Sequence, residues 1–124
     1  MIKFTESDLK EGYLVENPGW YEYKADTYVE KPAKTDGAPN HIWNFVGQNG
    51  EMTGVPVFKL ISSKMRADLV VIMKAFNGGV NPAAGTEIEG KDTVGIVIEA
   101  MTKRGTDQNG KTINDLIDFR PVKR

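Results

Sequence analysis

Residues 20–29 read WYEYKADTYV, and two kinds of side chain alternate along them. The odd positions are mostly apolar and the even positions are mostly charged. This period of two is typical of a β-strand with one face against a core and the other in water. The stretch follows Asn17-Pro18-Gly19, which has the composition of a turn. It therefore predicts a long first strand, on which Trp20 and Tyr28 are aromatic exceptions on the wet face.

Downstream of this strand, apolar runs alternate with turn residues. Strands are predicted over residues 41–46 and 55–61, on either side of the hairpin signal Asn49-Gly50. A helix of about four turns follows, because the next apolar residues recur at helical spacing: Met65, Leu69, Ile72, Met73 and Phe76. Residues 94–102 and 112–122 are predicted to form the last two strands, and a short extra strand can lie around residues 86–88.

Three strands, one helix and two strands make up the element order of the OB-fold, a small five-stranded Greek-key barrel. An SH3-like barrel or an α+β roll fits the same order, so these alternatives stay open. We expect a mainly β protein with a single OB-fold domain over residues 1–124, in which residues 1–12 are an irregular or briefly helical segment.

The composition of the 124 residues excludes several kinds of chemistry. There is no Cys, which excludes disulfides, thiolate nucleophiles and Cys-ligated zinc, and the single histidine cannot form a multi-histidine metal site. No nucleophile and base occur at a signature spacing, so we expect no enzymatic activity, no cofactor and no metal. The longest aliphatic run, residues 69–73, is far shorter than the ~20 residues of a membrane span. We therefore expect a cytoplasmic protein that does not enter membranes.

Charge is nearly balanced, with 16 Lys and Arg against 17 Asp and Glu, but its distribution is informative. An OB barrel uses the connections between strands 1 and 2 and between strands 4 and 5 to hold oligonucleotides or oligosaccharides. Here these connections are residues 31–40 and 103–111, and their cations are Lys31, Lys34, Lys103, Arg104 and Lys111. Five cations thus stand where an anion would be held.

The strands between these connections supply rings and further lysines. Binding of single-stranded nucleic acid needs aromatic rings that stack on bases and cations along the backbone, with no catalytic geometry. The candidates on strands 1 and 3 are Trp20, Lys24, Tyr28 and Lys59. On strand 2, His41 and Trp43 join them if these positions face outward. Which face of strand 2 is buried stays open, because its two apolar sets, Ile42 with Val46 and Trp43 with Phe45, lie on opposite faces.

Several short patterns resemble bacteriophage-encoded single-stranded DNA-binding proteins. They are PGWYEYKA at 18–25, KTDGAPN at 34–40, GVPV at 54–57, Ser63-Lys64 and NDLIDFRP at 114–121. The resemblance implies an OB-fold protein of the host cytoplasm that coats exposed single strands in replication or recombination, without catalysis. It implies single-stranded DNA as the partner, with RNA left open, and contacts to replication or recombination proteins. One departure is the basic end RPVKR at 120–124, where single-strand binders often carry an acidic tail that recruits partner enzymes.

The main alternative belongs to another functional class. The same barrel can serve as a structural or adaptor module that contacts protein, with its aromatic residues buried at a subunit interface, for example in a homodimer. The two readings differ in whether the rings and cations face solvent together.

Overall fold

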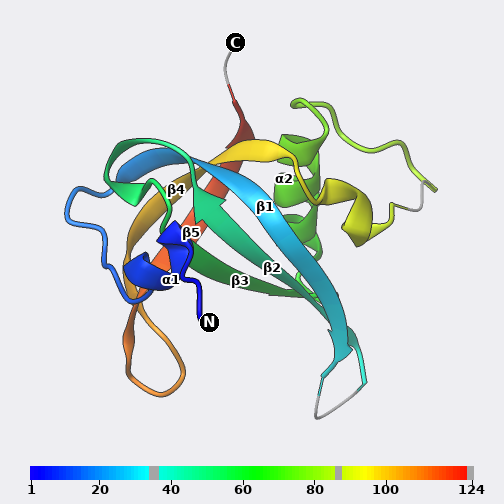
Figure 1. Cartoon of the computed structure of the whole chain (residues 1–124). Coiled ribbons are helices and arrows are strands. Elements are labelled where there is room, and N and C mark those ends of the chain that lie inside the picture. Colours follow the sequence, from blue (N-terminus) through cyan, green and yellow to red (C-terminus); the bar gives the residue numbers. More distant parts are fainter. Residues whose placement is uncertain (34–36, 86–87, 123–124) are drawn as a thin grey trace.

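The structure is a computed structural model that describes residues 1–33, 37–85 and 88–122, except for the side chains of residues 6 and 7. In chain order the elements are α1 (Glu6–Lys10), β1 (Gly19–Pro32), β2 (Pro39–Gly47), the 3-10 helix η1 (Gly50–Met52), β3 (Pro56–Ser62), α2 (Arg66–Phe76), the 3-10 helix η2 (Gly90–Thr93), β4 (Val97–Thr106) and β5 (Thr112–Pro121) (Figure 1). The predicted order of strands and the long helix between the third and fourth strands is confirmed. Of the short strand expected around residues 86–88, positions 86 and 87 lie outside the described residues, and Ile88 is not in a strand.

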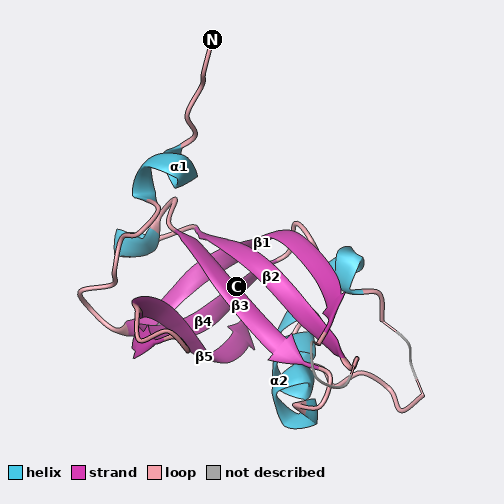
Figure 2. Ribbon diagram, turned by 90° about the horizontal axis from the view of Figure 1, so that it is seen from below, coloured by secondary structure: helices cyan, strands magenta, loops and turns pink. Residues whose placement is uncertain are grey.

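The five strands form one antiparallel sheet in the order β3-β2-β1-β4-β5, which confirms a mainly β protein. β1 is long enough to pair with β4 through residues 19–24 and with β2 through residues 23–32. The sheet is strongly curved, so that the two edge strands, β3 and β5, come into contact (Figure 2). No ladder joins these edges within the described residues. A side chain bridges them instead, because the Lys59 Nζ of β3 donates a 2.9 Å hydrogen bond to the Leu116 carbonyl of β5.

The core fills the concave side of this curved sheet. α2 packs against β5 and adds Ile72 and Ala75 to the core, which confirms that this helix is amphipathic. The largest fully buried side chains are Trp43, Tyr23, Phe45, Met52, Ile61, Ile72, Ile98 and Leu116. Rings from β1, β2, α2 and β5 contact one another there, as in the Phe45–Phe76 pair at 6.3 Å.

A β-bulge in β1 changes which side chains face the core. The register with β2 shifts between Ala25 and Thr27, so that Asp26 is the extra residue. Before the bulge the odd positions face the core, as predicted, with Tyr23 and Ala25 fully enclosed and Tyr21 half-buried. After it the parity reverses. Thr27 and Val29 are exposed, and Tyr28 turns toward the core side, so the prediction of Tyr28 on the wet face is wrong.

β2 buries the side chains at its odd positions. Trp43 and Phe45 are buried, whereas Asn44 is exposed and Ile42 and Val46 are only half-buried on the outer side. The inward parity buries two large rings, and these remove more apolar surface from water than the two aliphatic side chains would.

The chain begins with a short helix, as the briefly helical alternative for residues 1–12 predicts. Thr5 and Asp8 form a capping box, in which the Asp8 N–H donates to Thr5 Oγ1 and the Thr5 N–H donates to Asp8 Oδ2. α1 lies away from the strands, and the first residues extend beyond it (Figure 2). Within the described residues, every helix is too short or too polar to span a bilayer.

Candidate functional site

One half of the convex side of the sheet carries an exposed, mainly uncharged surface, which we call the outer face of β1–β3. Its rows follow from the strand register: Val29 pairs with Ile42, which pairs with Leu60, and in the next row Thr27, Asn44 and Phe58 lie side by side. The exposed fractions are 56% for Phe58, 44% for Val29 and 41% for Leu60. An aromatic ring that remains more than half exposed on a strand is available to stack on another ring.

Two lysines border this surface. Lys24 follows the buried Tyr23 and is exposed in the row of Val46, and Lys31 is exposed beyond Val29 near the end of β1. Both were predicted as nucleic-acid contacts, and the structure places them on the same face as Phe58. Lys34, predicted to act with Lys31, lies outside the described residues.

Trp20 lies on the other half of the convex side, where β1 pairs with β4. Its ring is half-buried, and the guanidinium of Arg120 covers it at 3.9 Å from the ring centre. Glu99 holds this guanidinium through a 2.7 Å bond from Arg120 Nε to Oε1. One side of the Trp20 ring is therefore occupied. Glu22 of β1 and Glu99 of β4 lie opposite each other in the strand register nearby.

The connection between β4 and β5 carries the other predicted cations. Lys103 and Lys111 are exposed, whereas Arg104 Nε donates a 2.7 Å bond to the Val15 carbonyl and so helps to hold the segment before β1. The β1–β2 and β4–β5 hairpins extend on opposite sides of the lower part of the molecule, with β2 and β3 between them (Figure 1). The cations thus flank the outer face of β1–β3 and do not form a single cluster.

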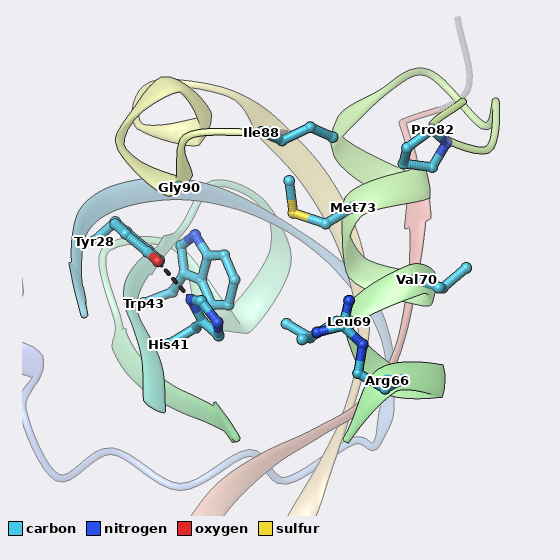
Figure 3. Close-up of a pocket in the computed structure, with 10 residues that line it drawn as sticks. All are labelled: Tyr28, His41, Trp43, Arg66, Leu69, Val70, Met73, Pro82, Ile88 and Gly90. Atoms are coloured by element: carbon cyan, nitrogen blue, oxygen red, sulfur yellow. Dashed lines mark hydrogen bonds between the residues drawn. The ribbon is translucent and has the colours of Figure 1, made fainter. Parts of the chain in front are cut away.

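The remaining predicted ring contacts do not lie on the convex side. Trp43 is 1% exposed, and its Nε1 donates a 2.9 Å hydrogen bond to Thr93 Oγ1, so its ring cannot stack on a base from the outer face. Tyr28 and His41 lie beside it on the same concave side, joined by a 2.6 Å hydrogen bond between Tyr28 OH and His41 Nδ1 (Figure 3). The prediction of these three rings as outward contacts is wrong, because of the bulge in β1 and the inward parity of β2.

Lys59 is also wrongly predicted as a contact of the outer strand face. It pairs with Trp43 and points to the concave side, where its ammonium group bonds to Leu116 O and lies 4.0 Å from Asp115 Oδ1. Its neighbour Phe58 is the exposed ring of β3 and was not among the predicted contacts. The one signal for it was the alternation with the buried Val57 and Ile61, and the apolar run of β3 obscured this signal.

A carboxylate fixes the start of β1. Glu51 accepts four hydrogen bonds, from the hydroxyls of Tyr13 and Tyr21 and from the backbone N–H groups of Glu16 and Asn17. The Glu16 N–H and the Tyr13 hydroxyl are the main reasons why the pKa of Glu51 is lowered from its ordinary 4.5 to about 2. The hydrogen bond from the Tyr13 hydroxyl to Glu51 in turn raises the pKa of Tyr13 to about 12. This network connects η1 to the segment that precedes the sheet.

Among the described residues, no three His, Asp or Glu side chains lie close enough together to hold a metal ion. Comparison of the sequence with protein-family models and with curated proteins finds no match.

Proposed function

We propose that this chain is a non-catalytic single-stranded DNA-binding protein whose binding surface is the outer face of β1–β3. The observation that carries the proposal is the exposed ring of Phe58 on a strand face bordered by Lys24 and Lys31. Bases of any sequence can stack on such a ring, and lysines at its border can neutralise the phosphates of the same strand.

The proposal includes an OB-type barrel that is partly open between β3 and β5. The sheet order β3-β2-β1-β4-β5, with β3 in contact with β5 and a helix between β3 and β4, supports it. Proteins with this barrel bind oligonucleotides over strands 2 and 3, between the β1–β2 and β4–β5 connections. In such a barrel, the outer face of β1–β3 would be the binding surface. As the resemblance of the sequence implies, the role would be that of a phage accessory factor in replication or recombination.

One observation favours the second candidate, a module that contacts protein. Val29, Ile42 and Leu60 form an aliphatic row next to Phe58, and aliphatic surface contributes more to a protein interface than to a phosphate backbone. A homodimer through this face is the simplest form of that alternative. It predicts a change of mass with protein concentration that added DNA does not alter.

The test of the proposal is fluorescence anisotropy with labelled oligo-dT of about 20 nucleotides. We expect binding that weakens steeply between about 50 and about 200 mM salt and that unlabelled duplex of equal length competes for poorly. Phe58→Ala should weaken binding about tenfold, because stacking on one ring contributes about 1–3 kcal/mol per base. The matched control is Phe4→Ala, which removes an exposed ring from the segment before α1.

A second variant tests the phosphate contacts. Each lost phosphate contact lowers the slope of log K against log salt by about 0.7 for a single strand. Lys24→Gln should produce this change, whereas Lys74→Gln, on the exposed side of α2, should leave the slope unaltered. If the anisotropy does not change at low salt, or if Phe58→Ala and Phe4→Ala bind alike, the proposal fails.

A further inference from the structure

The concave side of the sheet contains a pocket that the outer face does not use, which we call the α2 pocket. Tyr28, His41 and Trp43 form one wall and Arg66, Leu69 and Met73 of α2 form the other (Figure 3). Its volume is about 270 Å³, and Pro82 and Ile88 lie at its upper edge. It is open to solvent on one side.

The aromatic wall is fixed before any ligand arrives. The Tyr28 and Trp43 rings lie 5.1 Å apart, Trp43 Nε1 donates to Thr93 Oγ1, and the Thr93 hydroxyl donates in turn to the Gly90 carbonyl. Gly90 is required for this arrangement, because a Cβ there would lie 2.0 Å from Tyr28 Cζ. The polar atoms of the wall thus have hydrogen-bond partners within the protein. The ring of Tyr28 lines a pocket that can receive a flat group without rearrangement.

Two hydrogen bonds hold the imidazole of His41 in the aromatic wall. Burial raises the pKa of Tyr28, and the carboxylates of Glu30 and Glu89 raise it further. The phenol therefore keeps its proton at neutral pH, and its oxygen lies 2.6 Å from His41 Nδ1. His41 Nε2 lies 2.8 Å from Ser63 Oγ. Both ring nitrogens thus have hydrogen-bonded neighbours, which fix the imidazole in the wall of the pocket.

One cation, Arg66, lines the pocket. The guanidinium of Arg66, at the first residue of α2, donates through Nη1 to the Ser63 carbonyl at 3.2 Å. This contact uses one of its five N–H donors, and a guanidinium presents the others in a fork that matches phosphate. Ser63 also contacts His41, through Oγ at 2.8 Å from Nε2, so Arg66 lies beside the aromatic wall. A ligand with a flat ring and an attached anion matches this combination of a cation and aromatic rings.

The volume limits the size of the ring. At about 270 Å³ the pocket lies just below the roughly 300–1,000 Å³ of pockets for drug-sized ligands, so a single small ring fits it better than a larger group. We infer that the α2 pocket takes one unstacked pyrimidine nucleotide of a bound single strand, with its base between Tyr28 and Met73 and its phosphate on Arg66. This inference rests on the proposed function. Because the outer face and the pocket lie on opposite sides of the β1–β2 pair, the strand would pass around this hairpin.

The two tryptophans allow the sites to be observed separately by NMR. On addition of dTMP to the full chain, the indole N–H signal of Trp43 should shift, whereas that of Trp20, on the convex side, should not. Arg66→Ala should weaken dTMP binding about fivefold or more and leave binding of thymidine, which has no phosphate, unchanged; this ratio follows from the loss of a charge-assisted hydrogen bond. Lys74→Ala, on the same helix, is the matched control.

A second pair of variants tests the position of the base. Val70 lines the α2 pocket and is 50% exposed, so Val70→Trp should fill the mouth of the pocket and abolish binding of both dTMP and thymidine with little effect on folding. Val71 is 37% exposed and lies beside a different hollow, next to β5, so Val71→Trp should bind both ligands normally.

The outcomes separate this inference from the proposed function. The pocket inference is overturned if the Trp43 signal does not shift, if Val70→Trp binds dTMP as the wild type does, or if N-acetylphenylalanine, a probe for peptide ends, binds the pocket more tightly than dTMP. Oligo-dT binding that depends on Phe58 would survive each of these results. Conversely, a Trp43 shift with dTMP but no oligo-dT binding would retain the pocket and reject the outer face of β1–β3.

Discussion

Gly90→Ala is expected to destabilise the protein through a single steric contact. The added Cβ would lie 2.0 Å from Tyr28 Cζ and 2.3 and 2.4 Å from the two Cε atoms. Carbon atoms in contact are normally about 3.5–4.0 Å apart, so the ring or the backbone of η2 must move by about 1.5 Å or more. The ring cannot move freely, because it is bonded to His41 and packs against Trp43.

The expected size of the effect follows from these contacts. Overpacking costs about 1–3 kcal/mol, and disturbance of the Tyr28–His41 hydrogen bond costs about 1 kcal/mol more. For a chain of 124 residues, 1 kcal/mol corresponds to about 4 °C in Tm, so the variant should melt about 8–16 °C lower.

Thermal unfolding followed by circular dichroism measures this shift. The matched control is Gly19→Ala, because a Cβ at Gly19 meets no atom within 4 Å, and its Tm should change by less than about 2 °C. In a Tyr28→Ala background the ring is gone, so Gly90→Ala should have little further effect. Equal Tm values for the Gly90 and Gly19 variants would refute the steric argument and, with it, the preformed wall of the α2 pocket.

Three further predictions concern stability. Because the pKa of Glu51 is lowered from 4.5 to about 2, its hydrogen bonds stabilise the fold above about pH 4.5, and this contribution is lost as the pH falls toward 2. Glu51→Gln should therefore make the Tm at pH 7 and the Tm at pH 3 more similar than they are in the wild type. An unchanged difference between the two Tm values would contradict the stabilising role of these hydrogen bonds. Lys59→Met removes the ammonium group that bridges β3 and β5, leaves the Leu116 carbonyl without this donor, and should lower the free energy of unfolding in urea by about 1–3 kcal/mol, whereas Lys74→Met should not. Thr93→Val leaves the Trp43 indole N–H without its acceptor and should lower the free energy of unfolding by about 1–3 kcal/mol. The indole N–H signal of Trp43 in NMR spectra should shift as well. A variant as stable as the wild type would show that this bond contributes nothing to stability.

The alternation of residues 20–29, the turn signals between the later apolar runs and the helical spacing of residues 65–76 together predicted the order of the elements. They could not predict the bulge at Asp26, because an extra residue in one strand leaves no mark on local composition and yet reverses every side chain beyond it. Tyr28 was misplaced for this reason.

The candidate site was predicted only in part. Lys24 and Lys31 are on the expected face, because the charged positions of a half-buried strand face water. The apolar sequences of β2 and β3 offered two apolar faces each, and only the volume available in the core decides which face is buried. Contact between β3 and β5, which draws Lys59 inward, joins residues 57 positions apart and depends on the curvature of the whole sheet.

We propose that single-stranded DNA crosses the outer face of β1–β3. Photo-crosslinking of the full chain to oligo-dT that carries 5-bromodeoxyuridine, followed by mass spectrometry of the peptides, locates the bound strand on the protein. We expect a cross-link at Phe58 that disappears in Phe58→Ala and decreases as salt is raised. Cross-links that spare β3 altogether, or a complete lack of them under low salt, would contradict it.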